Sequence, residues 1–223
     1  MYREDPESFF NDVIHSDAEN ETQLINQCWP LFWSKYHYNL VENGIMEIIM
    51  KYNLSATGSA ILDIGSGTGH WIDFYRSYFD PSCIWSIDFA SGPLEKLKQK
   101  YENVVSFLHW DISAAIPDII SAERFDIINA IGIIFHIVDD IKWEKAIENL
   151  SALLSDKGVL IIGGDFGPTT LERGIMRKTH SLDEWEKLVQ TLGLKIIEVK
   201  RHDWWAGADN DGITDNLLAI KAR

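Results

Sequence analysis

Three alternate glycines that directly follow a short apolar run constrain this chain more than any other feature. The run 60–62 ends in an acid, Asp63, and Gly65, Gly67 and Gly69 follow before a pattern typical of a helix. A buried parallel strand that leads through a glycine-rich turn into a helix N-terminus is typical of a nucleotide-cofactor site. Glycine lets the backbone approach a ligand closely, since it has no Cβ. The segment therefore predicts an open α/β sheet that binds a cofactor.

The glycine spacing indicates which cofactor. A dinucleotide fingerprint reads G-x-G-x-x-G/A, but counting from Gly65 places His70 at the third position, and counting from Gly67 places Ile72 there. The spacing found, acid-x-G-x-G-x-G, resembles the first motif of the class I S-adenosylmethionine (SAM)-dependent methyltransferases. In that family the acid lies near the methionine amino group and the glycine turn faces the cofactor. The resemblance implies SAM as the cofactor and S-adenosylhomocysteine (SAH) as the product.

Size and charge narrow the partner class. A chain of 223 residues is one domain of ordinary size. Its net charge of −14 disfavours nucleic acid and anionic membrane surfaces, which need basic stripes, and leaves a small molecule as the expected partner. No apolar run is long enough for a transmembrane helix, and the first residues lack the layout of a secretion signal. Cys28 and Cys83 are expected to be reduced thiols, so we expect a cytoplasmic protein; the oligomeric state stays open.

From residue 60 onward, apolar runs alternate with helical patterns, which favours a parallel sheet with helices on both faces. The expected strands are 60–64, 83–88, 104–109, 125–130, 158–164, 194–201 and 214–222. The expected helices are roughly 68–79, 92–101, 114–122, 140–154 and 181–192. The family resemblance further implies a Rossmann-like, seven-stranded sheet whose antiparallel last strand lies between the fifth and sixth.

Residues 1–57 are interpreted as an N-terminal helical cap over the active site, and residues 58–223 as the SAM-binding domain. Aromatic residues at 29–36 share one helical face, and 41–52 reads as a further helix. Aromatic faces suit a flat or cationic substrate. The predicted substrate pocket comprises Trp29, Trp33, Tyr36, Trp204 and Trp205. The alternative, that the first two tryptophans only fix the cap to the core, stays open.

Acids at the carboxyl ends of successive strands complete the expected cofactor site. Asp88 lies 23 residues after Gly65, close to the spacing of an acid that binds ribose hydroxyls. Phe89 beside it would cover an adenine face, and the resemblance implies that Asp111 or its neighbours contact the adenine amino group. The alternative is that such acids only start turns or cap helices. The full predicted set is Asp63, Gly65, Gly67, Gly69, Asp88, Phe89, Asp111, Ile112 and Ala130.

The segment after the fourth strand holds the first candidate base. It is similar to the family's fourth motif, where two histidines often precede an acid; here Phe135 replaces the first, and His136 is kept. His136 is the candidate catalytic base or, alternatively, a packed structural residue. His180 is a weaker candidate, since it directly precedes a capping-box pattern, Ser-x-x-Glu. No metal site is expected, because Asp139 and Asp140 stand where they would cap a helix.

The resulting prediction is an enzyme that transfers a methyl group from SAM to an oxygen or nitrogen of a small molecule. A hydroxyl nucleophile benefits from a general base, whereas an amine needs only to be neutral. Two alternatives remain: a SAM-binding accessory or regulatory protein without turnover, and transfer of another group, such as aminopropyl. The acceptor itself is not identified by the sequence.

Overall fold

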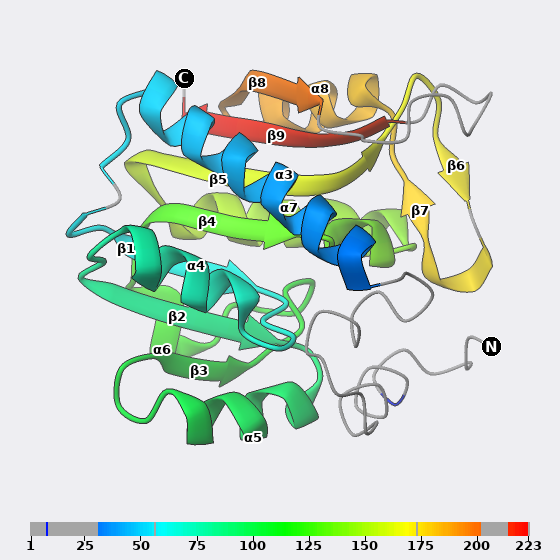
Figure 1. Cartoon of the computed structure of the whole chain (residues 1–223). Helices are drawn as coiled ribbons and strands as arrows, with labels where there is room; N and C mark the ends of the chain where they lie inside the picture. The colour runs from blue at the N-terminus through cyan, green and yellow to red at the C-terminus, as the bar shows by residue number, and fades with distance from the viewer. Residues whose placement is uncertain (1–7, 9–30, 56, 173, 202–213, 223) are drawn as a thin grey trace.

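The computed structural model describes residues 8, 31–55, 57–172, 174–201 and 214–222. It contains a seven-stranded sheet in the order β3-β2-β1-β4-β5-β9-β8 (Figure 1). Strand β9 pairs antiparallel with both β5 and β8, and the other pairs are parallel. The strands are β1 Ala60–Ile64, β2 Cys83–Asp88, β3 Ser106–His109, β4 Phe125–Ile131, β5 Leu154–Phe166, β8 Leu194–Arg201 and β9 Thr214–Ala222. The expected Rossmann-like topology is confirmed.

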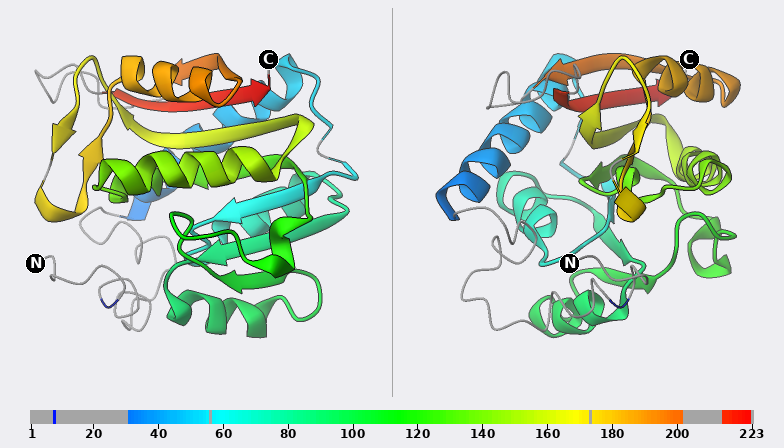
Figure 2. Two further views of the ribbon diagram at one scale, coloured as in Figure 1. Left: turned by 180° about the vertical axis from the view of Figure 1, so that it is seen from behind. Right: turned by 90° about the vertical axis from the view of Figure 1, so that its right-hand side faces the viewer.

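Helices cover both faces of this sheet. On one face lie α3 (Leu31–Lys51), α4 (His70–Tyr78) and α5 (Ser91–Lys100), and on the other lie α6 (Asp118–Ser121), α7 (Asp140–Leu153) and α8 (Leu182–Thr191) (Figure 2). A short 3-10 turn, η1 (Ile134–His136), follows β4. No helix in the described part of the chain is both long and apolar enough to cross a membrane.

The central strands read as continuous apolar runs because both of their faces are buried. In β5, for example, Val159 and Ile161 pack into the cluster under α3 and α4, whereas Leu160 and Ile162 pack into the cluster under α7 and α8. This alternation follows from the two-residue period of a strand. Because both faces of these strands are buried, functional side chains can reach a ligand only at the carboxyl ends of the parallel strands.

A second, two-stranded sheet was not expected from the sequence. Strands β6 (Leu171–Glu172) and β7 (Lys178–Thr179) form a hairpin whose connection includes the 3-10 turn η2 (Gly174–Met176). The hairpin lies beyond the carboxyl end of β5 (Figure 1). Strands of two residues carry no detectable alternation, so no sequence pattern predicts them.

Several element boundaries differ from expectation. The two helices expected before residue 53 are, over the described residues, one helix, α3, which buries Tyr38, Val41 and Ile45 on one face. The helix expected over 114–122 is only α6, four residues long, and β5 begins at Leu154 because that residue already pairs with Phe125. The capping box at the start of α8 is confirmed, and Asp139 caps α7.

Helix α3 packs into the same apolar cluster as α4 and the sheet, so the described part of the N-terminal segment is built into the core. The boundary near residue 57 between a cap and a catalytic domain stays a prediction. The exposed face of α3 carries Phe32, Trp33 and Tyr36. Trp29, Trp204 and Trp205 lie outside the described residues.

Candidate active site

The glycine turn joins β1 to α4 in a conformation that requires glycine. Gly65, Gly67 and Gly69 all have positive φ, at 75°, 48° and 87°. A side chain at such φ values is strained. The turn is fixed by backbone hydrogen bonds, since the Gly65 N–H donates to the Ile87 carbonyl at 2.7 Å. A Cβ added at Gly65 would also collide with the side chain of Ile133 from the segment after β4.

Asp63 is fully buried beneath this turn. Its Oδ1 accepts a hydrogen bond from Nδ2 of Asn129 at 3.0 Å, since the two residues are paired in register on β1 and β4. Its Oδ2 has no hydrogen-bond partner among the described residues. Burial raises the pKa of Asp63 to about 7. The Asn129 hydrogen bond lowers this pKa, the charge of Asp88 raises it, and the nearby Ser86 hydroxyl lowers it. An unpartnered buried carboxylate oxygen beside a glycine turn fits a ligand that brings a hydrogen-bond donor or a cation.

Asp88 ties the end of β2 to the glycine turn. Its Oδ2 accepts from the Gly67 N–H at 3.2 Å, and its Oδ1 accepts from the Ala90 N–H at 2.9 Å. Burial raises the pKa of Asp88, while these backbone donors oppose the rise. A carboxylate has about four lone-pair sites, so these backbone donors leave part of its accepting capacity for a ligand's hydroxyl groups. The backbone carbonyl of Phe89 lies 2.7 Å from Nε2 of His109, which fixes this corner.

Asp111 and Ile112 are placed differently from the buried acids Asp63 and Asp88. Asp111 is exposed, two residues after the end of β3, and its Oδ1 accepts from both N–H and Oγ of Ser113. Ile112 is buried in the cluster under α7, and its carbonyl accepts from Nδ2 of Asn149 at 2.8 Å. Asp111 thus starts a turn, as the alternative reading of these acids held, and the Ile112 side chain faces the core.

Ala130 is buried within β4, and His136, at the end of the 3-10 turn that follows this strand, is partly buried. Nδ1 of His136 lies 2.8 Å from the Met176 carbonyl in the hairpin. Because a carbonyl only accepts, Nδ1 carries the proton and Nε2 of the neutral ring is the acceptor. Burial lowers the pKa of His136 to about 4; the Met176 hydrogen bond raises it, and the charge of Arg177 lowers it further. The ring is therefore neutral at physiological pH.

His180, the weaker candidate base, is corrected to an interior position. Its ring is stacked on Trp143 with centroids 3.7 Å apart and is 4% exposed. Its Nε2 lies 3.0 Å from Oδ1 of Asp140, which also pairs with Nζ of Lys178 at 2.6 Å. Burial lowers the pKa of His180, whereas the Asp140 hydrogen bond raises it. His180 thus holds the hairpin against α7.

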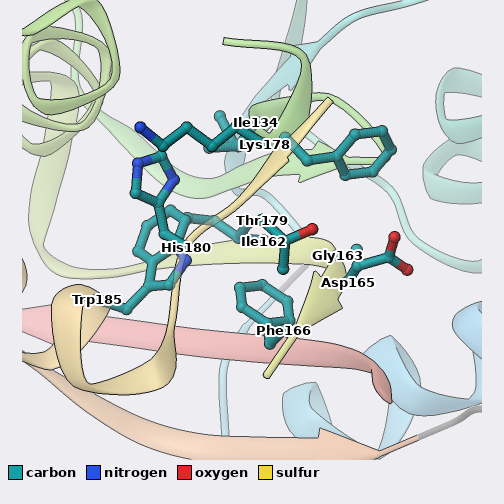
Figure 3. A pocket seen from close by; sticks show the side chains of 11 residues that line it. Ile134, Ile162, Gly163, Asp165, Phe166, Lys178, Thr179, His180 and Trp185 are labelled. Carbon is teal, nitrogen blue, oxygen red and sulfur yellow. The ribbon is translucent and has the colours of Figure 1, made fainter. Parts of the chain in front are cut away.

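A water-sized hollow of about 10 Å³ lies between the end of β5, the hairpin and α8 (Figure 3). Asp165, Phe166 and Thr179 are among the residues that line it. Beside it, Arg177 pairs with Asp165 and lies 4.5 Å from the centre of the Phe135 ring. A hollow of this size holds one water, so among the described residues it is no substrate pocket.

The structure adds residues that the sequence prediction missed. Asn129 is a polar residue in the middle of a buried strand, which is a readable signal for a partner such as Asp63. Ile133, which covers Gly65, and Arg177, which pairs with Asp165, carried no such signal. Of the predicted pocket aromatics, Trp33 and Tyr36 are described, and both are exposed on α3. Within the described ranges, no group of three or more His, Cys, Asp or Glu residues is placed to hold a metal.

The glycine turn, the buried acid below it and the strand order define the class: a SAM-dependent methyltransferase fold of class I. A family model described as a methyltransferase domain matches residues 61–158. The match begins in β1 and ends in β5, so it includes the glycine turn, Asp88 and His136. The predicted resemblance is thus confirmed as a methyltransferase domain over residues 61–158 within the fold of the class I SAM-dependent methyltransferases.

Solved structures share this fold at low sequence identity. A SAM-dependent methyltransferase of Leishmania major has 14% identity and a TM-score of 0.72, with 96% of this chain and 82% of that chain covered. An O-methyltransferase of a Brevibacillus brevis polyketide synthase, in complex with SAH, has 14% identity and a TM-score of 0.63, covering 93% and 81%. A Burkholderia thailandensis 1,6-didemethyltoxoflavin N1-methyltransferase, with SAH and its substrate, has 15% identity and a TM-score of 0.57, covering 87% and 91%. No curated protein matches the chain.

Proposed function

We propose that this chain transfers the methyl group of SAM to an oxygen or nitrogen of a small-molecule acceptor. The observation that carries the proposal is the buried Asp63, whose Oδ2 has no partner within the described residues, below a turn of three positive-φ glycines. Both O- and N-methyltransferases are among the structures with this fold. A cytoplasmic location and the absence of nucleic-acid substrates stay predictions from composition.

The residues at the carboxyl ends of β1 and β2 fit the cofactor. Asp63, oriented by Asn129, is proposed to bind the amino group of SAM, and Gly65, Gly67 and Gly69 to let the backbone approach it. Asp88 is proposed to accept hydrogen bonds from the ribose hydroxyls with the lone pairs that Gly67 and Ala90 leave available.

Fewer contacts in the structure support the part of the site that would bind the adenine ring. Phe89 and Asp111 are proposed to contact the adenine ring, Ile112 to do so through its backbone, and Ala130 to line the methyl-transfer site. When bound, SAM supplies an electrophilic methyl group on a sulfonium, which the acceptor's nucleophile attacks in line. The chain's own task is then to orient that nucleophile and exclude water.

His136 is the residue proposed to orient the nucleophile. Its Nε2, as the unprotonated ring nitrogen, accepts a hydrogen bond from the hydroxyl or amine of the acceptor. A pKa of about 4 makes it a weak base, so its main contribution is to direct a nucleophile lone pair toward the methyl group. An acceptor that must lose its proton early would need a lower pKa of its own.

The test is incubation of the full chain with methyl-labelled SAM and a small-metabolite extract, with the labelled product identified by mass. Calorimetry with SAH measures cofactor binding independently. We expect a labelled product and SAH binding that Asp88→Ala weakens at least tenfold. SAH binding without any product would favour the accessory protein without turnover, and no SAH binding would refute the proposal.

A further inference from the structure

Arg177 lies beside the segment of Phe135 and His136, at the acceptor end of the site, by which we mean the part near His136 where the acceptor is proposed to bind. It lies between η2 and β7, its guanidinium lies over the Phe135 ring, and it pairs with Oδ2 of Asp165 at the end of β5. Its side chain is 31% exposed. A guanidinium that lies on an aromatic face and is gripped by one carboxylate has a fixed orientation.

Among the residues that the structure describes, most of the hydrogen-bonding capacity of the Arg177 guanidinium is not used. A guanidinium has five N–H donors. Within the described residues, Asp165 is the acceptor found for Nη2, and Nε is buried without a partner. Leaving a buried donor of a charged group unpaired is costly, so such a group suits a ligand that brings acceptor oxygens.

The location of Arg177 is set by its neighbour in the chain. Met176 directly precedes it, and the Met176 carbonyl holds His136 at 2.8 Å. The charge of Arg177 also acts on the His136 ring. Arg177 therefore lies on the same side of the hairpin contact as the segment that carries Phe135 and His136.

The charges around Arg177 decide which anion it suits. Asp165 already offsets one positive charge, and Lys178, the next residue, is directed to Asp140 and Glu172. The neutral His136 adds no positive charge. One guanidinium shared with one carboxylate fits a single negative charge and disfavours a dianion such as a phosphate monoester. Planar, two-oxygen recognition by a guanidinium fork fits a carboxylate.

We propose that the methyl acceptor carries a carboxylate group and that Arg177 binds it, with Asp165 holding the guanidinium in orientation. The inference rests on the proposed function, because it names the acceptor class for the same site. The competing explanation is a brace: the Arg177–Asp165 pair would only fasten the hairpin to β5.

Two variants separate these explanations because they remove opposite halves of the pair. If Arg177 binds the acceptor, Arg177→Met abolishes carboxylate binding. Asp165→Asn keeps or strengthens it, because the amide oxygen can still accept from the guanidinium while the competing negative charge is removed. If the pair is only a brace, both variants behave alike. Arg124→Gln is the matched control, since it removes one positive charge from an exposed arginine whose hydrogen bonds, as far as the described ranges show, go to the carbonyls of Ser121 and Glu123.

The binding experiment uses the full chain saturated with SAH and two probes of nearly equal shape, benzoate and benzamide, followed by NMR line broadening of the probe. We expect benzoate to bind at least tenfold more tightly than benzamide, with the preference lost in Arg177→Met and kept in Asp165→Asn and Arg124→Gln. Equal binding of the two probes, no benzoate binding, or a preference that survives in Arg177→Met would overturn the inference.

The labelled product of the turnover experiment is an independent check. A product whose acceptor carries a carboxyl group, with KM raised at least tenfold in Arg177→Met and kcat changed less, supports the assignment. A neutral or cationic acceptor refutes it while leaving methyl transfer intact. Failure to bind SAH would instead remove the proposed function, so the two failures are distinguishable.

Discussion

The glycine turn and the β6–β7 hairpin lie at the same edge of the sheet, but different contacts hold them. The turn is fixed by backbone groups: the N–H of Gly65 donates to the Ile87 carbonyl, and the N–H of Gly67 donates to Asp88. The hairpin is fixed largely by side chains, with Asp140 pairing Lys178 and His180. The positive φ values of the turn tolerate almost no residue other than glycine, whereas charged side-chain contacts can be exchanged for others. The comparison teaches that the proposed cofactor side of the site is specified by backbone conformation, and the proposed acceptor side by side-chain chemistry.

The largest effect is expected from a substitution in the glycine turn. Gly65→Ala adds strain at φ 75° and a collision with Ile133, so we expect loss of measurable SAH binding by calorimetry. Gly58→Ala is the matched control, because Gly58 has φ 74° but nothing within 4 Å of an added Cβ. It should cost only about 1–2 kcal/mol of stability and leave binding intact. Equal effects of the two variants would mean that strain alone decides, and the role of Ile133 would be rejected.

His136→Asn tests the acceptor end at one atom. An asparagine amide can reproduce the Nδ1 donor to the Met176 carbonyl but has no group at the position of Nε2. We expect kcat to fall by about 10²-fold with SAH affinity unchanged. The complementary variant, His136→Gln, should lose the hairpin contact and raise the acceptor KM instead. Full turnover in His136→Asn would show that Nε2 takes no part.

Asp63→Asn is expected to weaken SAH binding about tenfold by removing the charge at the unpartnered oxygen. It should also change the pH dependence of stability. Because burial raises the native pKa of Asp63 to about 7, the native state holds a proton that the unfolded chain has lost between roughly pH 4 and 7. This residue therefore lowers stability as pH rises through that window, by at most a few kcal/mol.

Urea unfolding of the Asp63→Asn variant at pH 5 and pH 8 measures this slope. The variant should be less sensitive to pH than the parent chain and comparatively more stable at pH 8. A parent chain whose stability does not fall between pH 5 and 8 relative to the variant would contradict the raised pKa.

The smallest effect is expected at the hairpin. Asp140→Asn weakens the contacts to Lys178 and His180 at a largely exposed carboxylate, so we expect a loss of about 1 kcal/mol or less. The acceptor KM should rise about twofold, which corresponds to about 0.4 kcal/mol and so to only part of that free energy, while SAH affinity stays the same. Thermal unfolding and steady-state kinetics measure both. A larger effect on SAH than on the acceptor would remove the proposed division between the two ends.

The cofactor end was predictable because its residues follow from local rules. Alternate glycines after a buried strand, and an acid at the end of the next strand, each have a stereochemical reason that the sequence displays. The strand order also followed, from the family resemblance. The single helix α3 was predicted as two, because its exposed aromatic face and its apolar face were read as separate segments.

The acceptor end was less predictable for a physical reason. The pairs His136–Met176 and Asp165–Arg177 join residues 40 and 12 positions apart through side chains and a loop. No periodicity in the sequence encodes such contacts. Likewise, the sequence indicates only that His180 precedes a helix cap, whereas the structure shows that its ring is stacked on Trp143.

The position of β9 has a consequence for how the chain is made. The nine residues Thr214–Ala222 are the last strand in the sequence, yet they stand between β5 and β8 and hydrogen-bond to both. During synthesis, β8 has no neighbour in the sheet until this segment leaves the ribosome. This half of the sheet is therefore completed only after residues 214–222 have been synthesised, and a nascent chain stalled before residue 214 would leave the edge of β5 unpaired and open to chaperones and proteases.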